Sequence, residues 1–338
     1  MIHILIALVS AFLFGASTPL GKLLLDSLPP FQLAGLLYLG AALGVLPFSL
    51  GQGRAVIRMG GLNKLRLAGA IGFGGVLGPV CLLFGLQSAS ASSVAMWLNL
   101  ELAATAVLGY FIFNDHLGRL GWLGVAGTLG ASLMLSWQEG AGGGTALIFL
   151  GIAGISWGVD NHLTALIDGI TPAQSTFWKG LAAGTMNMGI SWIFEPFSLG
   201  VQPIVWALVV GMFAYGVSIS LYIRSAQNLG ATRSQMIFSA APFFGVVLSF
   251  LVLKESLNWV QAASAGVLVL SLVTLFRDRH GHSHTHEPLS HTHDHSHDDD
   301  HHTHGATHPG ECHSHWHLHD PVSHGHPHWP DIHHRHPH

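Results

Sequence analysis

Hydrophobic residues in this chain gather in ten long runs, separated by short segments rich in glycine, proline or charge. A run of about 20 apolar residues is long enough to cross the hydrocarbon core of a bilayer as a helix. The runs cover residues 3–22, 31–50, 66–86, 91–112, 119–137, 146–167, 172–194, 203–223, 232–253 and 259–276. The pattern predicts an all-α integral membrane protein with ten transmembrane helices.

The composition agrees with a membrane location. The chain is 49% hydrophobic and only 9% charged, whereas soluble domains average about 25% charged residues. The basic patch typical of nucleic-acid binding is absent from the sequence. The first run ends at Lys22 and has no small-residue cleavage site, so we expect a retained span and not a signal peptide. Cys81 and Cys312 lie in different regions and imply no disulfide framework.

Basic residues predict the orientation, because loops rich in Lys and Arg stay on the cytoplasmic side. With the N-terminus in the cytoplasm, that side receives nine basic residues and the outside two. The nine are Arg54, Arg58, Lys64, Arg66, Arg119, Arg224, Arg233, Arg277 and Arg279, and the two are Lys22 and Lys254. We expect a multi-pass protein of a bacterial inner (plasma) membrane with both termini in the cytoplasm.

The two halves of the chain align at an offset of 140 residues. The matching stretches are Ala91–Met96 with Ala231–Met236, and Tyr110–Leu117 with Phe250–Leu257. Each half holds five spans, so the second copy must enter the membrane from the opposite side. The alignment predicts two inverted five-helix repeats, over residues 1–138 and 145–277. Inverted repeats are typical of secondary transporters.

Family-like residues accompany these repeats. The first half has Phe14-Gly15-Ala16-Ser17 with Pro19 and Lys22, and the second half has Ser156-Trp157-Gly158. Over residues 4–276 the chain resembles drug/metabolite transporters of the EamA type. The resemblance implies a secondary active transporter, in the export direction, of a small organic metabolite, amino acid or drug-like compound. One departure is Glu101, which stands near the place where the family commonly has a proline, as Pro242 does in the second half.

Four ionisable residues stand out inside predicted spans, where each costs about 2.5–3.5 kcal/mol at the helix centre: Glu101, Asp160, His162 and Lys179. We expect Glu101 and Asp160 to line a central cavity, because burial favours a protonated carboxyl that can exchange a proton, and because a carboxylate can hold a cationic substrate. The alternative is a carboxylate neutralised within the bundle, for example by Lys179. We interpret His162 as packed, and Lys179 as reaching towards the cytoplasmic interface.

Aromatic and amide residues near the two carboxylates complete the predicted binding site. They are Trp97, Asn99, Trp157, Asn161, Tyr215 and Tyr222. Tyrosine and tryptophan are also common anchors at the membrane interface, and that alternative stays open. The segment Gly154–Gly158 fits the G-x-S-x-G pattern of hydrolases, but it lies inside a predicted transmembrane helix and not on a strand-to-helix turn. We therefore expect no enzyme activity.

Residues 278–338 form a tail that holds 23 of the 26 histidines. Without apolar residues for a core, we expect it to be disordered and cytoplasmic. Imidazole favours Zn, Ni, Co and Cu, so the tail is expected to bind these metals weakly at many sites, including His282, His284, His286, His291, His293, His295 and His297. No cofactor is required.

The expected partners are the lipid bilayer, a small-molecule substrate, protons and divalent transition metals, and the sequence leaves a homodimer open. Two other functions also stay open. The protein could transport a transition metal or metal chelate with the tail as collector or sensor, or it could be a membrane-tethered metal store.

Overall fold

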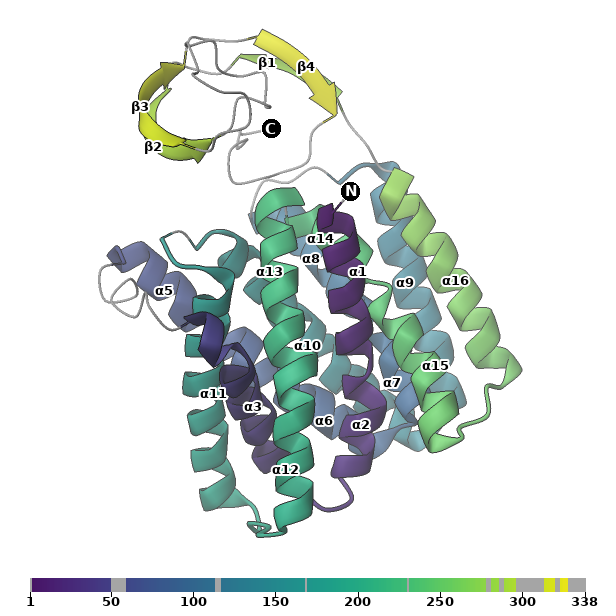
Figure 1. Cartoon of the computed structure of the whole chain (residues 1–338). Helices are drawn as coiled ribbons and strands as arrows, with labels where there is room; N and C mark the ends of the chain where they lie inside the picture. Colours follow the sequence, from purple (N-terminus) through teal and green to yellow (C-terminus); the bar gives the residue numbers. More distant parts are fainter. Residues whose placement is uncertain are drawn as a thin grey trace. The chain divides into compact units, whose positions relative to one another are not determined.

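The computed structural model describes two parts of the chain. The first comprises residues 2–49, 59–112, 117–167, 169–229 and 231–277, and the second comprises residues 281–285, 289–295, 313–319 and 323–327. The first part is a helical bundle (Figure 1). Its helices are α1 (Ile2–Gly15), α2 (Ser17–Leu24), α3 (Pro30–Ser49), α5 (Gly61–Ala70), the π-helix η1 (Ile71–Leu77), α6 (Gly78–Ser88), α7 (Ala91–Trp97), α8 (Asn99–Ile112), α9 (Arg119–Gln138), α10 (Ala141–Ala165), α11 (Pro172–Phe194), α12 (Val201–Val210), the π-helix η2 (Gly211–Val217), α13 (Ser218–Leu229), α14 (Ala231–Phe238), α15 (Ala241–Leu253) and α16 (Trp259–Arg277).

Each predicted span corresponds to a helical stretch, so the all-α membrane fold is confirmed. Eight stretches of the described chain are long and apolar enough to cross a membrane, and α15 is a shorter apolar helix. The remaining span, α11, is 23 residues long and carries buried polar residues, among them Gln174, Lys179 and Asn187. These lower its hydropathy without interrupting the helix. They face other helices, where polar groups find partners that lipid cannot offer.

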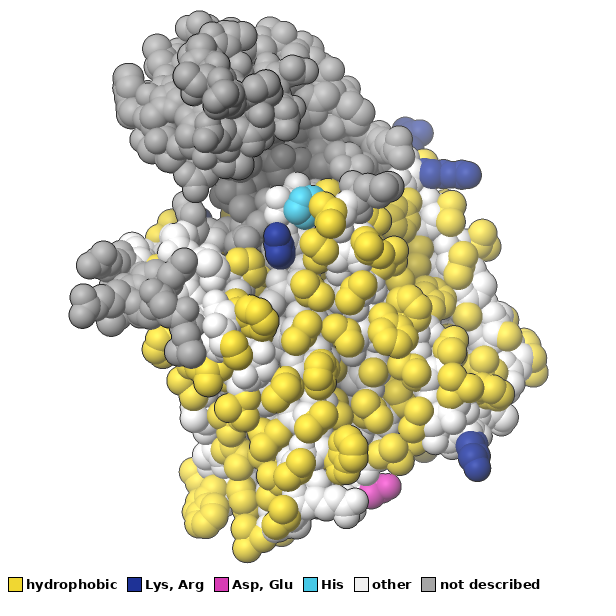
Figure 2. Space-filling view, viewed as in Figure 1, with side chains coloured by type: hydrophobic (Ala, Val, Ile, Leu, Met, Phe, Trp, Pro, Cys, Tyr) yellow, Lys and Arg dark blue, Asp and Glu magenta, His cyan; other side chains and the backbone are white. Residues whose placement is uncertain are grey.

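Figure 2 shows one face of the bundle covered with hydrophobic side chains, with coloured basic and acidic groups only near its two ends. Large apolar residues such as Phe12, Leu133, Phe250 and Leu270 are exposed. A contiguous apolar surface of this kind would associate in water, whereas lipid solvates it.

Helix irregularities recur in the two halves at a separation of 140 residues. The π-helical segments η1 and η2 occupy equivalent positions. The break between α7 and α8 at Leu98 likewise has its counterpart between α14 and α15 at residues 239–240. Pro242 lacks a backbone N–H and cannot donate to the carbonyl of Phe238, which favours the second break. The two halves thus share local geometry that a regular helix would not have.

The ends of the bundle differ in charge. We call the end at which α1 begins the N-terminal end, and the opposite end, where α2 finishes, the far end. Short connections make consecutive spans antiparallel, so each loop can be placed at one end. The described basic residues at the N-terminal end are Lys64, Arg66, Arg119, Arg224, Arg233 and Arg277, and those at the far end are Lys22 and Lys254.

The described part of the tail consists of four strands, β1 (Gly281–Thr285), β2 (Leu289–His295), β3 (His313–His319) and β4 (Ser323–Pro327). They form two antiparallel two-stranded ladders, β1 with β4 and β2 with β3. The sequence predicts no regular structure here. Alternating histidine with serine and threonine fits the two-residue period of a strand, but an isolated two-stranded ladder is at most marginally stable in water.

Candidate functional site

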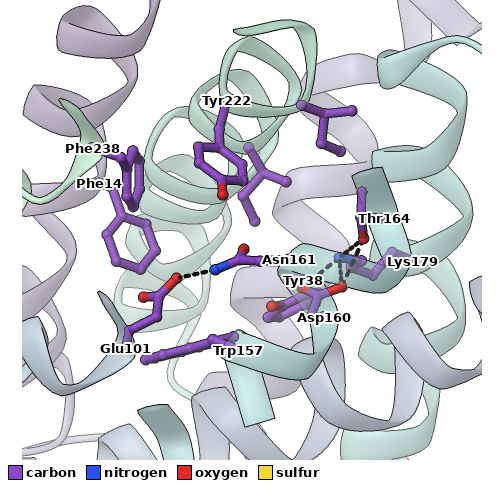
Figure 3. A pocket seen from close by; sticks show the side chains of 12 residues that line it. Phe14, Tyr38, Glu101, Trp157, Asp160, Asn161, Thr164, Lys179, Tyr222 and Phe238 are labelled. Atoms are coloured by element: carbon purple, nitrogen blue, oxygen red, sulfur yellow. Dashed lines mark hydrogen bonds and ion pairs between the residues drawn. The ribbon is translucent and has the colours of Figure 1, made fainter. Parts of the chain in front are cut away.

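A cavity of about 40 Å³ lies inside the bundle, enclosed by helices from both halves. Figure 3 shows two polar groups on opposite sides of it, Glu101 with Asn161 and Asp160 with Lys179 and Thr164. The lining residues are Phe14, Tyr38, Glu101, Trp157, Asp160, Asn161, Thr164, Lys179, Ile219, Tyr222, Ile223 and Phe238. A mostly apolar wall with a few placed polar groups is the composition of a small-molecule site, and the volume in this conformation is below the about 300–1,000 Å³ of such sites.

Glu101 lies near the start of α8, and two amide side chains, those of Asn161 and Gln235, hydrogen-bond to its carboxylate. The Nδ2 of Asn161 donates to its Oε1 at 2.9 Å and lies 3.3 Å from the hydroxyl of Thr105. Close packing of α10 on α8 makes this contact possible. A Cβ added at Gly154 or Gly158 would lie 3.1 Å from backbone atoms of α8. Within the described chain Glu101 forms no salt bridge.

Asp160, in contrast to Glu101, forms an ion pair, and its partner is Lys179. The Nζ of Lys179 lies 2.6 and 2.7 Å from its two carboxylate oxygens, and the hydroxyl of Thr164 donates to Oδ1 at 2.8 Å. Lys179 is only 2% exposed, so the prediction that it reaches the membrane interface is wrong. The helices α10 and α11 are consecutive and antiparallel. The side chain of Lys179 therefore reaches the carboxylate of Asp160 inside the bundle and does not extend to the membrane surface. The alternative interpretation of Asp160, neutralisation by Lys179, is the arrangement in the structure.

The π-helix η1 forms the wall beside this ion pair. Its Gly74 carbonyl accepts hydrogen bonds from the hydroxyl of Tyr38 and from the Nε1 of Trp157, the latter at 3.2 Å. Gly74 also leaves room for the carboxylate, because an added Cβ would lie 2.0 Å from Oδ2 of Asp160. A π-bulge often marks a functional position in a helix, and this one places a bare backbone beside Asp160 and a carbonyl that accepts from Tyr38 and Trp157.

Aromatic rings cover the side of the cavity above Glu101. Phe14 and Phe238 have ring centroids 5.2 Å apart, and Tyr222 lies 5.0 Å from Phe238. The hydroxyl of Tyr222 is buried and has no hydrogen-bond partner among the described residues. It is therefore a polar group available to a solute in this cavity.

Of the predicted site residues, Glu101, Trp157, Asp160, Asn161 and Tyr222 line the cavity. The other three predicted residues lie elsewhere. Tyr215 is packed behind the wall against Phe14 and Tyr38, with ring centroids 5.6 and 5.4 Å away. Trp97 donates to the carbonyl of Ser132 at 2.9 Å, and Asn99 lines a second, smaller cavity.

His162 behaves as a packed residue, because its ring contacts the carbonyl of Thr105 at 3.0 Å. Sequence reasoning missed Phe14, Tyr38, Thr164 and Phe238. Phe14 could have been found from its family-like stretch. The others carry no signal in the sequence, because helix packing alone brings them to the cavity.

The tail histidines are described only by their backbone. His282 and His284 belong to β1, and His291, His293 and His295 belong to β2. His286 and His297 lie outside the described residues. Among the described residues, no three His, Cys, Asp or Glu side chains gather in a way that could hold a metal ion.

Carboxylates tie helices together at the far end. Glu255 accepts from the backbone N–H groups of Ala91 and Ser92, both at 2.9 Å, at the start of α7. Glu195 accepts in the same way from Phe31 and Gln32 at the start of α3. An anionic side chain at a helix N-terminus satisfies free N–H groups and matches the helix dipole. These links cross between the halves of the chain and hold them together at the far end.

The model of the EamA-like transporter family matches residues 1–137 and again residues 144–277. The chain belongs to the EamA-like transporter family. The family predicted from the sequence is therefore confirmed, and with it a multi-pass membrane protein that acts as a transporter.

Individual relatives of this family member are distant. It is 24% identical over 301 residues to an uncharacterized transporter of Methanothermobacter thermautotrophicus, with 80% of this chain and 84% of the relative aligned. It is also 24% identical over 291 residues to an uncharacterized transporter of Synechocystis, with 77% and 86% aligned. A WAT1-related chloroplastic protein of Arabidopsis thaliana is 24% identical over 287 residues, with 78% and 67% aligned.

Among the solved structures that match the fold is a crystal structure with a TM-score of 0.61 and 15% identity, over 81% of this chain and 96% of that one. At this identity the likeness concerns the fold alone.

Proposed function

We propose that this EamA-family protein is a secondary active exporter of a small organic solute, which binds in the central cavity, and that transport is coupled to a proton on Glu101. The observation that carries the proposal is a buried carboxylate with two amide partners, Asn161 and Gln235, and no ion-pair partner in the described chain. Such a group costs free energy when charged in a bilayer, so it favours taking up a proton or a cationic group.

The repeated halves support alternating access. We propose repeats over residues 1–138 and 145–277 that exchange two mirror-related conformations around one site. The cavity residues Thr164, Lys179 and Tyr222 lie in the parts of α10, α11 and α13 nearer to the N-terminal end, whereas the carboxylate links hold the two halves together at the far end. The basic residues at the N-terminal end support its placement in the cytoplasm. We propose on this basis a protein of the inner membrane whose cavity is reached from the cytoplasmic side in this conformation.

Proton-coupled transport can be tested with the full chain in proteoliposomes. A panel of amino acids, organic amines, carboxylates and lipophilic drugs would be offered, and solute-driven proton movement would be read with a pH-sensitive dye inside the vesicles. We expect at least one solute to move protons with the wild type and none to do so with Glu101→Gln, because glutamine keeps the shape but cannot exchange a proton.

The matched control is Asp26→Asn, which makes the same chemical change on an exposed residue at the far end. It should transport as the wild type does. Proton movement that persists in a folded Glu101→Gln variant would contradict the proposed coupling.

Transition-metal transport remains the second prediction. The carboxylate and amide oxygens of the described cavity suit hard cations better than zinc, nickel or copper, which prefer imidazole and thiolate. Adding zinc or nickel to the same vesicles tests this prediction, since a metal or chelate carrier would show metal flux that removal of residues 280–338 alters.

A further inference from the structure

A second cavity, of about 10 Å³, lies where the two broken helices cross. Its lining includes Leu98, Asn99, Glu101 and Leu102 of the first break. It also includes the residues 140 positions later, Phe238, Ser239, Ala241 and Pro242, together with Phe14 and Gln235. The cavity therefore lies between equivalent breaks of the two halves. Its volume is close to the about 10–15 Å³ that a single water molecule needs.

Two amide oxygens in this cavity have no donor. The Oδ1 of Asn99 and the Oε1 of Gln235 are buried and form no hydrogen bond within the described chain, although each residue is only 2% exposed. The orientation of Asn99 is fixed by its other amide atom, because Nδ2 donates to the carbonyl of Met96 at 3.1 Å. A buried acceptor without a partner costs about 1–3 kcal/mol.

Glu101 adds a negative charge to these two oxygens, because it lines both cavities. A protonated carboxyl has one O–H group and can satisfy only one of the two amide oxygens. Carboxylate and amide oxygens are both ligands of hard cations, so a small cation can satisfy the two amide oxygens beside the carboxylate, to which the side chain of Gln235 is hydrogen-bonded. Interrupted transmembrane helices also place backbone carbonyls and helix C-terminal ends where coupling ions bind in transporters.

We propose that this second cavity is a Na⁺ site formed by the Oδ1 of Asn99, the Oε1 of Gln235 and the carboxylate of Glu101. The site rests on the proposed function, because Glu101 belongs to both cavities. Na⁺ and a proton compete for the carboxylate of Glu101. When Glu101 is protonated, a water molecule takes the place of the ion. The chain then exchanges solute against either ion.

The test is direct binding of ²²Na⁺ to the purified full chain, with K⁺ and a bulky organic cation as competitors at constant ionic strength. We expect saturable binding that Na⁺ displaces, that K⁺ and the organic cation do not, and that weakens as the pH falls. Asn99→Ala and Gln235→Met should each weaken binding by at least about tenfold, since even changes outside the ligand shell cost about 10- to 100-fold in metal affinity.

The matched control is Asn187→Ala. Asn187 also has a buried amide oxygen without a partner in the described chain, and it lines neither cavity. This variant should bind Na⁺ as the wild type does. Gln235→Met keeps the side-chain volume, so it remains informative if Asn99→Ala does not fold.

The outcomes separate the two proposals. Absence of saturable Na⁺ binding to folded protein, or binding unchanged in both variants, would overturn the Na⁺ site, and proton-coupled transport would still stand. Na⁺ binding that Asn99→Ala and Gln235→Met weaken, together with unaltered solute transport in Glu101→Gln, would retain the ion site and remove the proposed coupling.

Discussion

Glu101 and Asp160 are both buried carboxylates of one cavity, but the structure surrounds them differently. Asp160 has an ammonium group against both of its oxygens and a hydroxyl against one of them. Glu101 has two neutral amide partners, Asn161 and Gln235, and no ion pair in the described chain. In an ion pair the positive partner compensates the charge of the carboxylate, whereas a neutral amide leaves that charge uncompensated. The comparison therefore supports the proposal that Glu101, and not Asp160, exchanges a proton or binds a cation.

The largest effect is expected from breaking the ion pair. Lys179→Met leaves a buried carboxylate without its partner, which should lower the free energy of unfolding by about 3–5 kcal/mol. The double variant Asp160→Leu with Lys179→Met removes both charges and should recover most of this loss. Thermal unfolding in lipid nanodiscs, followed by tryptophan fluorescence, measures both. Equal stability of the single and double variants would contradict a structural role for the pair.

An intermediate effect is expected at Gly74. Alanine there would place a Cβ 2.0 Å from Oδ2 of Asp160, so the ion pair or the π-helix must shift, at a cost of about 1–3 kcal/mol. Gly72→Ala is the matched control in the same π-helical segment, because an added Cβ at Gly72 meets nothing within 4 Å. Measured under the same conditions, Gly74→Ala should lower the free energy of unfolding more than Gly72→Ala does. Similar losses would show that the π-helix itself, and not the space beside Asp160, requires glycine.

The smallest effect on stability is expected at Glu101. The amide oxygen of Glu101→Gln can still accept from Asn161, so the free energy of unfolding should change by no more than about 1 kcal/mol. The same unfolding assay tests this, with Asp160→Asn as the comparison. The loss of free energy of unfolding in Asp160→Asn should be several times larger than in Glu101→Gln. A loss at Glu101 as large as at Asp160 would make both carboxylates structural and would remove the contrast between them.

Much of the fold could be predicted from local sequence. Hydrophobic runs of bilayer length specify helices because lipid offers the backbone no hydrogen-bond partner. The offset of 140 residues found in the sequence also describes the recurrence of η1 in η2. The π-helical form of these segments could not be predicted, since glycine-rich apolar stretches also form regular transmembrane helices. The breaks were foreseeable only in part, at Pro242, where the sequence itself removes a donor.

The sequence by itself determined which residues are costly in a membrane, because a charge or amide among apolar residues is visible without a structure. It therefore singled out Glu101, Asp160 and Lys179. Only the tertiary structure decided that Lys179 pairs with Asp160 and that Asn161 holds Glu101. The physical reason is that pairing depends on helix rotation and on the close approach allowed at Gly158 and Gly74. Neighbouring helices set those properties jointly, and no single segment contains them.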